Sequence, residues 1–425
     1  MEAKDRRQRP DGRKLPLIFC LAPLCLAAFI LANALIYRAA NAGRPQAVAG
    51  TDGTPSFLPV LRKDSTPSPI ATPITAAPQF VKNVPLPGAQ CPNAVGFNAV
   101  SGYVYIANNF SDNVSVLQHT NFITNIPTGE WPTLIAADPD SALTYVTVLH
   151  DRVTALSATN IVGYIPNHYE PYGIAVNPVN GYIYITDLDS LVQVADGTTQ
   201  VADVPITDPD TGGGAGWLQP VVVDPNTGLV YVASWSHGRL YVLDGTAVIT
   251  SYRAGWGVKD MAIDAARGYI YIAHESPNAT YPHNISVFNI QAQTIKPIST
   301  ATNSRAVAVD PLSGYAYATN EQDDTVTVLL RTQVVATLPA GDGPVAVGVN
   351  PNTGYAFVTN TGSHDITVYK DGALVTTIGA QGLRPFAVGV DTLTNDVYIA
   401  NRGLEIPNPP EFTPICTHAS VTILR

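Results

Sequence analysis

The stretch GPVAVGVNPNTGYAFVTNTGSHDITVYKDGALVTTIGA, residues 343–380, decides the fold of this chain. It holds an apolar run, an Asn-Pro-Asn-Thr-Gly turn, an alternating aromatic run, a polar loop and two more alternating runs. Proline fixes φ at the second position of a tight turn, and glycine accepts the positive φ that ends it. The stretch therefore predicts four short antiparallel strands, which we call A, B, C and D in chain order.

The same unit recurs through residues 79–425, which predicts a repeat architecture. Strands A, B and C each recur eight times, whereas strand D follows strand C only seven times. The missing copy stands at the front, because FVKNVPLPG (80–88) resembles VVATLPAG (334–341). We therefore expect an all-β, eight-bladed β-propeller of four-stranded antiparallel blades, with the N-terminal strand closing the last blade and hiding its edge.

A column of small residues midway along strand A favours a closed ring over a linear array. Innermost strands crowd around a central channel, where small side chains let neighbouring backbones approach. Seven of the eight column residues are glycine or alanine: Gly96, Ala136, Ala175, Val222, Ala262, Ala308, Gly348 and Gly389.

The first 78 residues have a different composition. Residues 1–14 are basic, and residues 15–37 (LPLIFCLAPLCLAAFILANALIY) carry no charge over a length that spans a bilayer. This pattern predicts a cytoplasmic basic segment, a transmembrane signal-anchor helix and an exported body at the cell surface. The alternative is a secreted protein whose signal peptide is cleaved near Ala40-Asn41-Ala42. Residues 38–78 contain seven prolines and predict a disordered linker.

Charge excludes one class of partner. The chain carries −10 overall, but residues 1–45 carry +5, so the remainder carries −15. An acidic body of this kind repels phosphate backbones, and no nucleic-acid partner is expected.

The repeats resemble a known family. Tyr105-Ile106-Ala107-Asn108 and Phe357-Val358-Thr359-Asn360, together with Asn-Pro-Asn-Thr-Gly at residues 350–354, are similar to the YVTN-type β-propeller repeat of surface-layer and secreted prokaryotic proteins. The resemblance covers residues 80–425 and implies a propeller outside the cytoplasm. It implies no activity, because a fold is not a function. More distantly the chain resembles propeller lactonases, which implies an acidic metal site at the channel.

Two cysteines fall where the chain ends meet. Cys91 follows the N-terminal strand, and Cys416 lies in the long insertion 401–420 of the last blade. We predict a disulfide between them that locks ring closure, as an oxidising compartment allows. Two buried free thiols are the alternative.

Unusual residues gather on one face, the one that carries the D–A and B–C loops. We call it the upper face, and the face with the A–B and C–D turns the lower face. All four tryptophans belong to the upper face: Trp131, Trp217, Trp235 and Trp256. Seven of the eight histidines and the insertions 204–219, 274–284 and 401–420 do too. Exposed aromatic residues on loops predict a ligand-binding surface. The alternative is that longer loops simply collect uncommon residues.

The residue that begins each A strand sets the mouth of the channel. These residues are Asn93, Thr133, Tyr172, Gln219, Lys259, Arg305, Val345 and Phe386. A lactonase-like metal centre needs acids here, and acids are missing. Lys259 and Arg305 come from adjacent blades and suit an anionic group such as a carboxylate or sugar acid. Alternatively, they pair with nearby acids such as Asp260. Tyr172, His237 and His274 complete the candidate ligand-binding residues.

A metal site has only weak candidates. His237, His274 and His283 lie on neighbouring blades, yet they show no short ligand spacing. No nucleophile elbow, Walker loop or dinucleotide fingerprint occurs, so we expect no cofactor and assign no catalytic residue.

The sequence therefore predicts a membrane-anchored binding module outside the cytoplasm whose upper face meets a protein, a glycan or a small ligand at the cell surface. Two alternatives remain. One is an enzyme with a channel-mouth site, lactonase-like or a metal-dependent hydrolase. The other is a passive surface-layer component.

Overall fold

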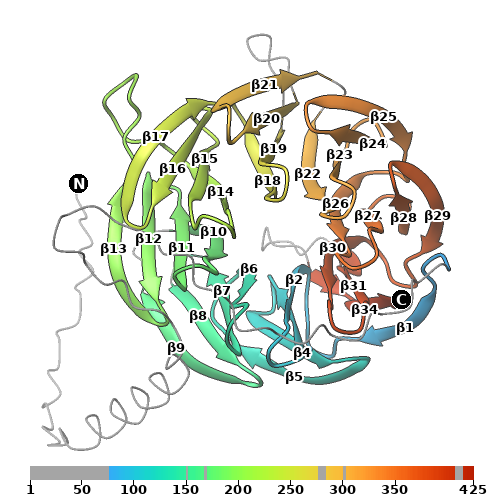
Figure 1. The fold of residues 1–425 in the computed structure, drawn as a ribbon. Helices are drawn as coiled ribbons and strands as arrows, with labels where there is room; N and C mark the ends of the chain where they lie inside the picture. The colour runs from blue at the N-terminus through green and yellow to red at the C-terminus, as the bar shows by residue number, and fades with distance from the viewer. Residues whose placement is uncertain (1–75, 150–151, 167–169, 276–283, 300–302, 407–414) are drawn as a thin grey trace, which may run out of the picture. The chain divides into compact units, whose positions relative to one another are not determined.

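A computed structural model describes residues 76–149, 152–166, 170–275, 284–299, 303–406 and 415–425. These residues form eight four-stranded antiparallel sheets and one two-stranded sheet. The eight sheets stand as blades around a common centre (Figure 1), which confirms the predicted propeller. The predicted helix over 15–37 and most of the predicted linker lie outside the described residues. Within those residues, no helix is long and apolar enough to cross a membrane.

Each blade runs A, B, C, D from the centre outward, and blade 1 begins at Pro92. The innermost A strands are β2 (Pro92–Asn98), β6 (Pro132–Ala137), β10 (Pro171–Val176), β14 (Leu218–Val223), β18 (Val258–Asp264), β22 (Ser304–Val309), β26 (Pro344–Val349) and β30 (Pro385–Val390). The B strands are β3 (Tyr103–Asn108), β7 (Leu143–Val148), β11 (Tyr182–Asp187), β15 (Val230–Ser234), β19 (Tyr269–His274), β23 (Tyr315–Asn320), β27 (Ala356–Asn360) and β31 (Val397–Asn401).

The C strands are β4 (Asn113–Gln118), β8 (Arg152–Ser157), β12 (Leu191–Asp196), β16 (Arg239–Asp244), β20 (Ile285–Asn289), β24 (Thr325–Leu330), β28 (Asp365–Lys370) and β34 (Ser420–Leu424). The outermost D strands are β5 (Asn121–Pro127), β9 (Asn160–Pro166), β13 (Thr199–Pro205), β17 (Ala247–Arg253), β21 (Thr294–Ile298), β25 (Gln333–Pro339), β29 (Ala373–Gly379) and β1 (Phe80–Pro85). A small hairpin, β32 (Leu404–Ile406) and β33 (Ile415–Thr417), lies between β31 and β34.

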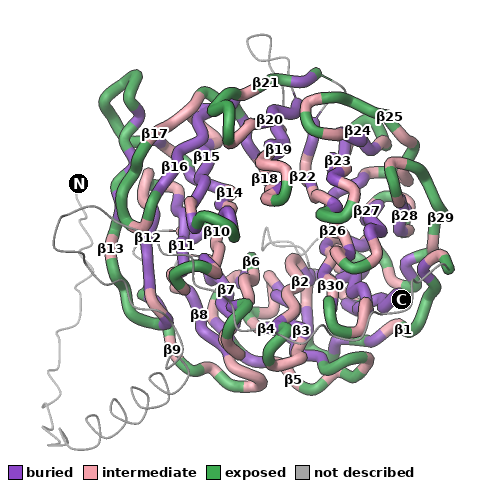
Figure 2. The backbone as a smooth tube through the Cα atoms, in the orientation of Figure 1, coloured by how far each residue is buried: buried purple, intermediate pink, exposed green. Residues whose placement is uncertain are grey.

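The core lies along the two middle strands of each blade, where nearly every residue is buried (Figure 2). The small-residue column of the A strands is explained by contact between blades. A Cβ on Gly389 of β30 would lie 2.4 Å from Cγ1 of Val95 on β2, and one on Gly348 would lie 2.6 Å from Cγ1 of Val388. A β-branched residue of the next blade therefore occupies the space that a side chain would need.

Buried aromatic residues of the B strands join each blade to the next. The column consists of Tyr105, Tyr145, Tyr184, Tyr231, Tyr271, Tyr317, Phe357 and Tyr398. The Tyr105 hydroxyl donates to the carbonyl of Ala158, at 3.0 Å, in the C–D turn of the following blade. The Tyr398 hydroxyl of blade 8 donates to His119 O of blade 1, at 3.2 Å, so the same contact repeats across the closing interface.

The last blade is closed by the first strand, as predicted. β1 pairs antiparallel with β34 from Pro85 opposite Ser420 to Phe80 opposite Leu424. Gln79 and Arg425 then exchange two backbone hydrogen bonds, of 2.8 and 3.0 Å. On the upper face a disulfide joins Cys91 to Cys416, whose Cα atoms are 5.2 Å apart, as the sequence predicted.

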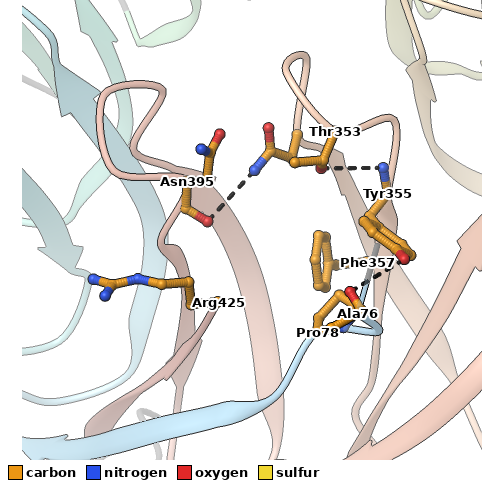
Figure 3. Close-up of a pocket in the computed structure, with 8 residues that line it drawn as sticks. Ala76, Pro78, Thr353, Tyr355, Phe357, Asn395 and Arg425 are labelled. Atoms are coloured by element: carbon orange, nitrogen blue, oxygen red, sulfur yellow. Dashed lines mark hydrogen bonds between the residues drawn. The ribbon is translucent and has the colours of Figure 1, made fainter. Parts of the chain in front are cut away.

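The lower face holds the chain where it enters β1. Figure 3 shows Ala76 and Pro78 in a small pocket beside Tyr355 and Phe357 of blade 7. The Tyr355 hydroxyl donates to Ala76 O at 3.4 Å. Nearby, the guanidinium of Arg425 makes a two-bond fork with the buried carboxylate of Asp396, at 2.6 and 2.7 Å. The closing blade is thus fastened on both faces.

We expect loss of the disulfide to lower stability strongly, because it closes a loop of most of the propeller. Replacing both cysteines (Cys91→Ser with Cys416→Ser) should lower the free energy of unfolding by about 3–5 kcal/mol. Urea unfolding of the full chain, with and without reductant, measures this. Reductant should destabilise the wild type and leave the double variant unchanged; an equal response of both would contradict a structural role for the bond.

We expect Gly389→Val to disturb the closing interface, because the new side chain meets Val95. Overpacking of this kind costs about 1–3 kcal/mol. The matched control is Gly213→Ala, whose Cβ would meet nothing closer than 3.6 Å. Thermal unfolding should show a lower melting temperature for Gly389→Val only. Equal melting temperatures for the two variants would show that the column does not set the approach of the blades.

Candidate functional site

Three of the four tryptophans gather on the upper face between blades 4 and 5. The rings of Trp217 and Trp235 lie 5.3 Å apart, and the ring of Trp256 stacks on His237 at 6.5 Å and 23°. Trp217 is 48% exposed and Trp256 44%. We call Trp217, Trp235, His237 and Trp256 the tryptophan cluster.

A ladder of backbone hydrogen bonds fixes this cluster. Trp235 N donates to Trp217 O at 2.8 Å, Gly257 N to Trp235 O at 2.9 Å, and Glu275 N to Gly257 O at 2.7 Å. Consecutive loop segments of blades 4 and 5 thus continue the pairing of the strands below them. The aromatic rings are therefore presented from backbone that is already ordered.

The insertion 204–219 is held by ion pairs. The carboxylate of Asp210 binds both Arg239, which is buried, and Arg253, at 2.6 Å. These two arginines hold the pKa of Asp210 below its usual range, the hydrogen bond from Arg239 being the larger cause. Asp208 lies 3.5 Å from Arg239 and 3.9 Å from His237. Both acids of this insertion therefore already have partners, and these pairs hold the loop that carries Trp217 beside His237.

Two other predicted aromatic residues lie elsewhere on the same face. Trp131 is half-buried in the loop before β6, where its backbone N–H donates to Asp112 at 3.1 Å. Tyr172 is 37% exposed at the start of β10. Both belong to the upper face but not to the tryptophan cluster.

The last residue of strand B has a structural role that explains His274. In Asn108, Asn320, Asn360 and Asn401 the side-chain amide donates to a hydroxyl of strand C, such as Thr367 Oγ1, 2.8 Å from Asn360. His274 is 1% exposed and stands in the same position, with its ring nitrogens 3.0 Å from Ser286 Oγ and Trp256 O. His274 therefore supports the loop of Trp256 rather than reaching the surface.

The histidines do not form a ligand group among the described residues, and His283 lies outside them. One cluster of three potential metal ligands occurs in that part of the chain: Cys91, Glu405 and Cys416, with ligand atoms within 4.8 Å. The disulfide joins the two sulfurs, and Glu405 pairs with Arg384 at 2.5 Å. These contacts already account for all three groups.

The cations at the channel mouth pair with acids, but not with Asp260. Lys259 lies 3.2 Å from Glu275, and Arg305 lies 2.9 Å from Glu321. Both acids directly follow the B strand of the same blade. The carboxylate of Asp260 instead accepts backbone N–H groups from Met261 and from Val307 of β22, each at 2.9 Å.

Sequence reasoning placed Phe386, Arg305 and Asn93 at the mouth but missed Arg402. The guanidinium of Arg402 lies 3.4 Å from the ring centroid of Phe386, and that of Arg305 lies 5.6 Å from it. Arg402 also donates to Asn93 Oδ1 of blade 1, at 2.5 Å. A signal was present: Arg402 follows its B strand by one residue, in the register of Glu275 and Glu321.

Comparisons with known proteins support the architecture only. No family model matches the chain, and no curated protein matches it. Among solved structures, a chain of the hydrazine synthase of Kuenenia stuttgartiensis is similar, with a TM-score of 0.55 and 16% identity over 66% of this chain and 96% of that one. A likeness at this identity extends to the fold and not to an activity.

Asp260 should make stability depend on pH. Burial raises its pKa to about 6, from an ordinary value near 3.8. The folded state therefore disfavours the ionised form, and this cost grows as the pH rises from about 4 to above 6. Between pH 4.5 and 7.5 the wild type should lose about 2 kcal/mol relative to Asp260→Asn.

Urea unfolding of both proteins at the two pH values measures the difference. Any pH-independent effect of the substitution on the two backbone hydrogen bonds cancels in this comparison. A constant difference between wild type and variant would show that folding does not raise the pKa of Asp260.

Proposed function

We propose that this chain is a membrane-anchored, extracytoplasmic binding protein that recognises its ligand with the tryptophan cluster of the upper face. The observation that carries the proposal is the presence of large, exposed aromatic rings on an ordered backbone. A tryptophan side chain offers a large contact area and loses little conformational entropy on binding. Tryptophan is also enriched among the interface residues that contribute most of the binding energy.

The mode of binding follows from the backbone. Because the N–H groups of Trp235, Gly257 and Glu275 already donate within the ladder, a peptide gains little by adding a strand here. Recognition then depends on side chains: flat rings for stacking, and the polar groups around them. A glycan at the cell surface suits these contacts better than an extended peptide does.

The described chain enters the propeller on the lower face, opposite the tryptophan cluster. Ala76 and Pro78 lead into β1 from the lower face, next to the A–B turn of blade 7. Entry on this side leaves the tryptophan cluster accessible to a ligand. The similarity of the repeats to YVTN-type propellers supports the proposed location outside the cytoplasm.

Substitution in the cluster tests the proposal. Full-length protein in mild detergent is applied to an array of cell-surface oligosaccharides, and the best binder is titrated against variants. Trp217→Ala and Trp256→Ala should each weaken binding about 30-fold, as expected for a dominant aromatic contact of about 2 kcal/mol.

The control is Leu393→Ala, a change of an exposed apolar residue in a turn of the lower face. It should leave the affinity unchanged. Binding that survives both tryptophan substitutions but is lost with Leu393→Ala would move the recognition surface to the lower face and overturn the proposal.

A further inference from the structure

Three arginines converge at the channel mouth of blades 6 to 8. Arg305 is the second residue of the A strand of blade 6, Arg384 precedes the A strand of blade 8, and Arg402 follows the B strand of blade 8. Arg305 and Arg402 both approach the ring of Phe386. We call Arg305, Arg384 and Arg402 the arginine cluster. It belongs to the upper face, like the tryptophan cluster.

The arginine cluster has more positive charge than its partners neutralise. Glu321 binds Arg305, while Glu405 is shared between Arg384 at 2.5 Å and Arg402 at 3.7 Å. Among the described residues, three guanidinium groups thus meet two carboxylates. Each of the three side chains keeps 20–30% of its surface exposed, so a ligand can reach them.

Arg402 shows the effect of this surplus. The pKa of Arg402 is lowered to about 10, mainly by burial; Glu405 raises it, and the neighbouring cations Arg384 and Arg305 lower it. Its Nε–H group is buried without a hydrogen-bond partner. A further anion beside the exposed part of the cluster would offset the excess positive charge. Guanidinium groups bind carboxylates through paired hydrogen bonds, which makes a carboxylate the fitting anion.

The charge of the arginine cluster and the net charge of the rest of the chain limit how many negative charges the ligand carries. The surplus in the cluster is one positive charge, whereas the chain after residue 45 carries −15. A polyanion would be repelled by the body as a whole, whereas a largely neutral molecule with an isolated carboxylate would not. The paired backbone beside the tryptophan cluster disfavours a peptide, since strand addition has no free N–H groups to use there.

We propose that the arginine cluster is an acid-binding subsite that selects oligosaccharides carrying a sparse uronic acid. This inference rests on the proposed function, because the tryptophan cluster holds the neutral sugars of the same ligand. The arginines then discriminate the acid-bearing glycan from its neutral counterpart. The discrimination comes from a charge-assisted hydrogen bond made only by the carboxylate.

The test compares matched probes: xylotetraose, and xylotriose carrying one glucuronic acid. Full-length protein in mild detergent is titrated with each by calorimetry. The glucuronic-acid probe should bind about tenfold tighter than the neutral one, as expected for a hydrogen bond to a charged group. Equal affinities, or no binding of the acid-bearing probe, would overturn the assignment.

Two substitutions should change this preference in opposite directions. Arg384→Gln removes the surplus charge and should abolish the tenfold preference, whereas Glu405→Gln adds to the surplus and should increase it. Loss of folding cannot produce opposite effects, and Arg331→Gln, on a lower-face turn, is the matched control. A preference that stays constant in both variants would overturn the inference.

Two further outcomes separate this inference from the proposed function. Trp217→Ala should weaken both probes equally; if it weakens neither, the proposed function fails whatever the arginines do. Titration with acetyl-tetraalanine, whose one charge is its terminal carboxylate, distinguishes the ligand class. Tighter binding of this peptide than of the glucuronic-acid probe would replace the glycan by a peptide and overturn the proposal.

Discussion

Ring closure is the constraint on which the rest of this structure depends. Seven blades take all four strands from consecutive residues, but the eighth takes its outermost strand from the other end of the described chain, through the pairing of β1 with β34. Without this pairing, β34 would be an exposed edge. The closing contacts repeat those of the other interfaces: Tyr398 reaches His119 as Tyr105 reaches Ala158, and Val95 fills the space beside Gly389. The closing interface therefore has the same contacts as the other interfaces, and the closing blade has the disulfide and the Arg425–Asp396 ion pair in addition. Because the ring is complete, the loops of the upper face can keep a fixed geometry.

The fold could be predicted from the sequence because its signals recur in register. Strand alternation recurs in all eight blades, and seven of the eight residues in the inner column are small, so a single departure such as Val222 does not obscure the pattern. The partners of Lys259 and Arg305 were harder to see, because each pair joins strand A to the residue after strand B. That relation requires the register between the two strands. Glu405 lies in the insertion where the last blade departs from the repeat, so no other blade offers an aligned position. The pairing of Glu405 opposite Cys416 in the small hairpin became visible only in three dimensions.

The candidate site shows how two blades of a repeat protein can differ from the others at a single position and support different loops. Where the repeat is regular, the last residue of strand B is an asparagine that ties strand C to its own blade, as Asn360 does with Thr367. In blades 4 and 5 the same position is Ser234 and His274. Ser234 donates to Ala215 O, whereas His274 keeps a contact with strand C through Ser286 and adds one to Trp256 O. The network is kept, but its outer partners are now the loops that carry the tryptophans. Positioning by buried, satisfied polar groups favours a preorganised surface, because little ordering entropy remains to be lost on binding.

The fastening of the ring and the charge of the channel mouth are linked through one hairpin. Cys416 lies in β33, directly opposite Glu405 in β32, and its disulfide to Cys91 anchors the hairpin to the loop that follows β1. Glu405 in turn holds Arg384 and lies near Arg402. The bond that closes the ring therefore also fixes the carboxylate that limits the positive surplus of the arginine cluster. If the hairpin were released, Glu405 would no longer be held against these arginines, and the mouth would become more cationic. A structural disulfide thus sets an electrostatic property of the surface at some distance along the chain, through two short strands.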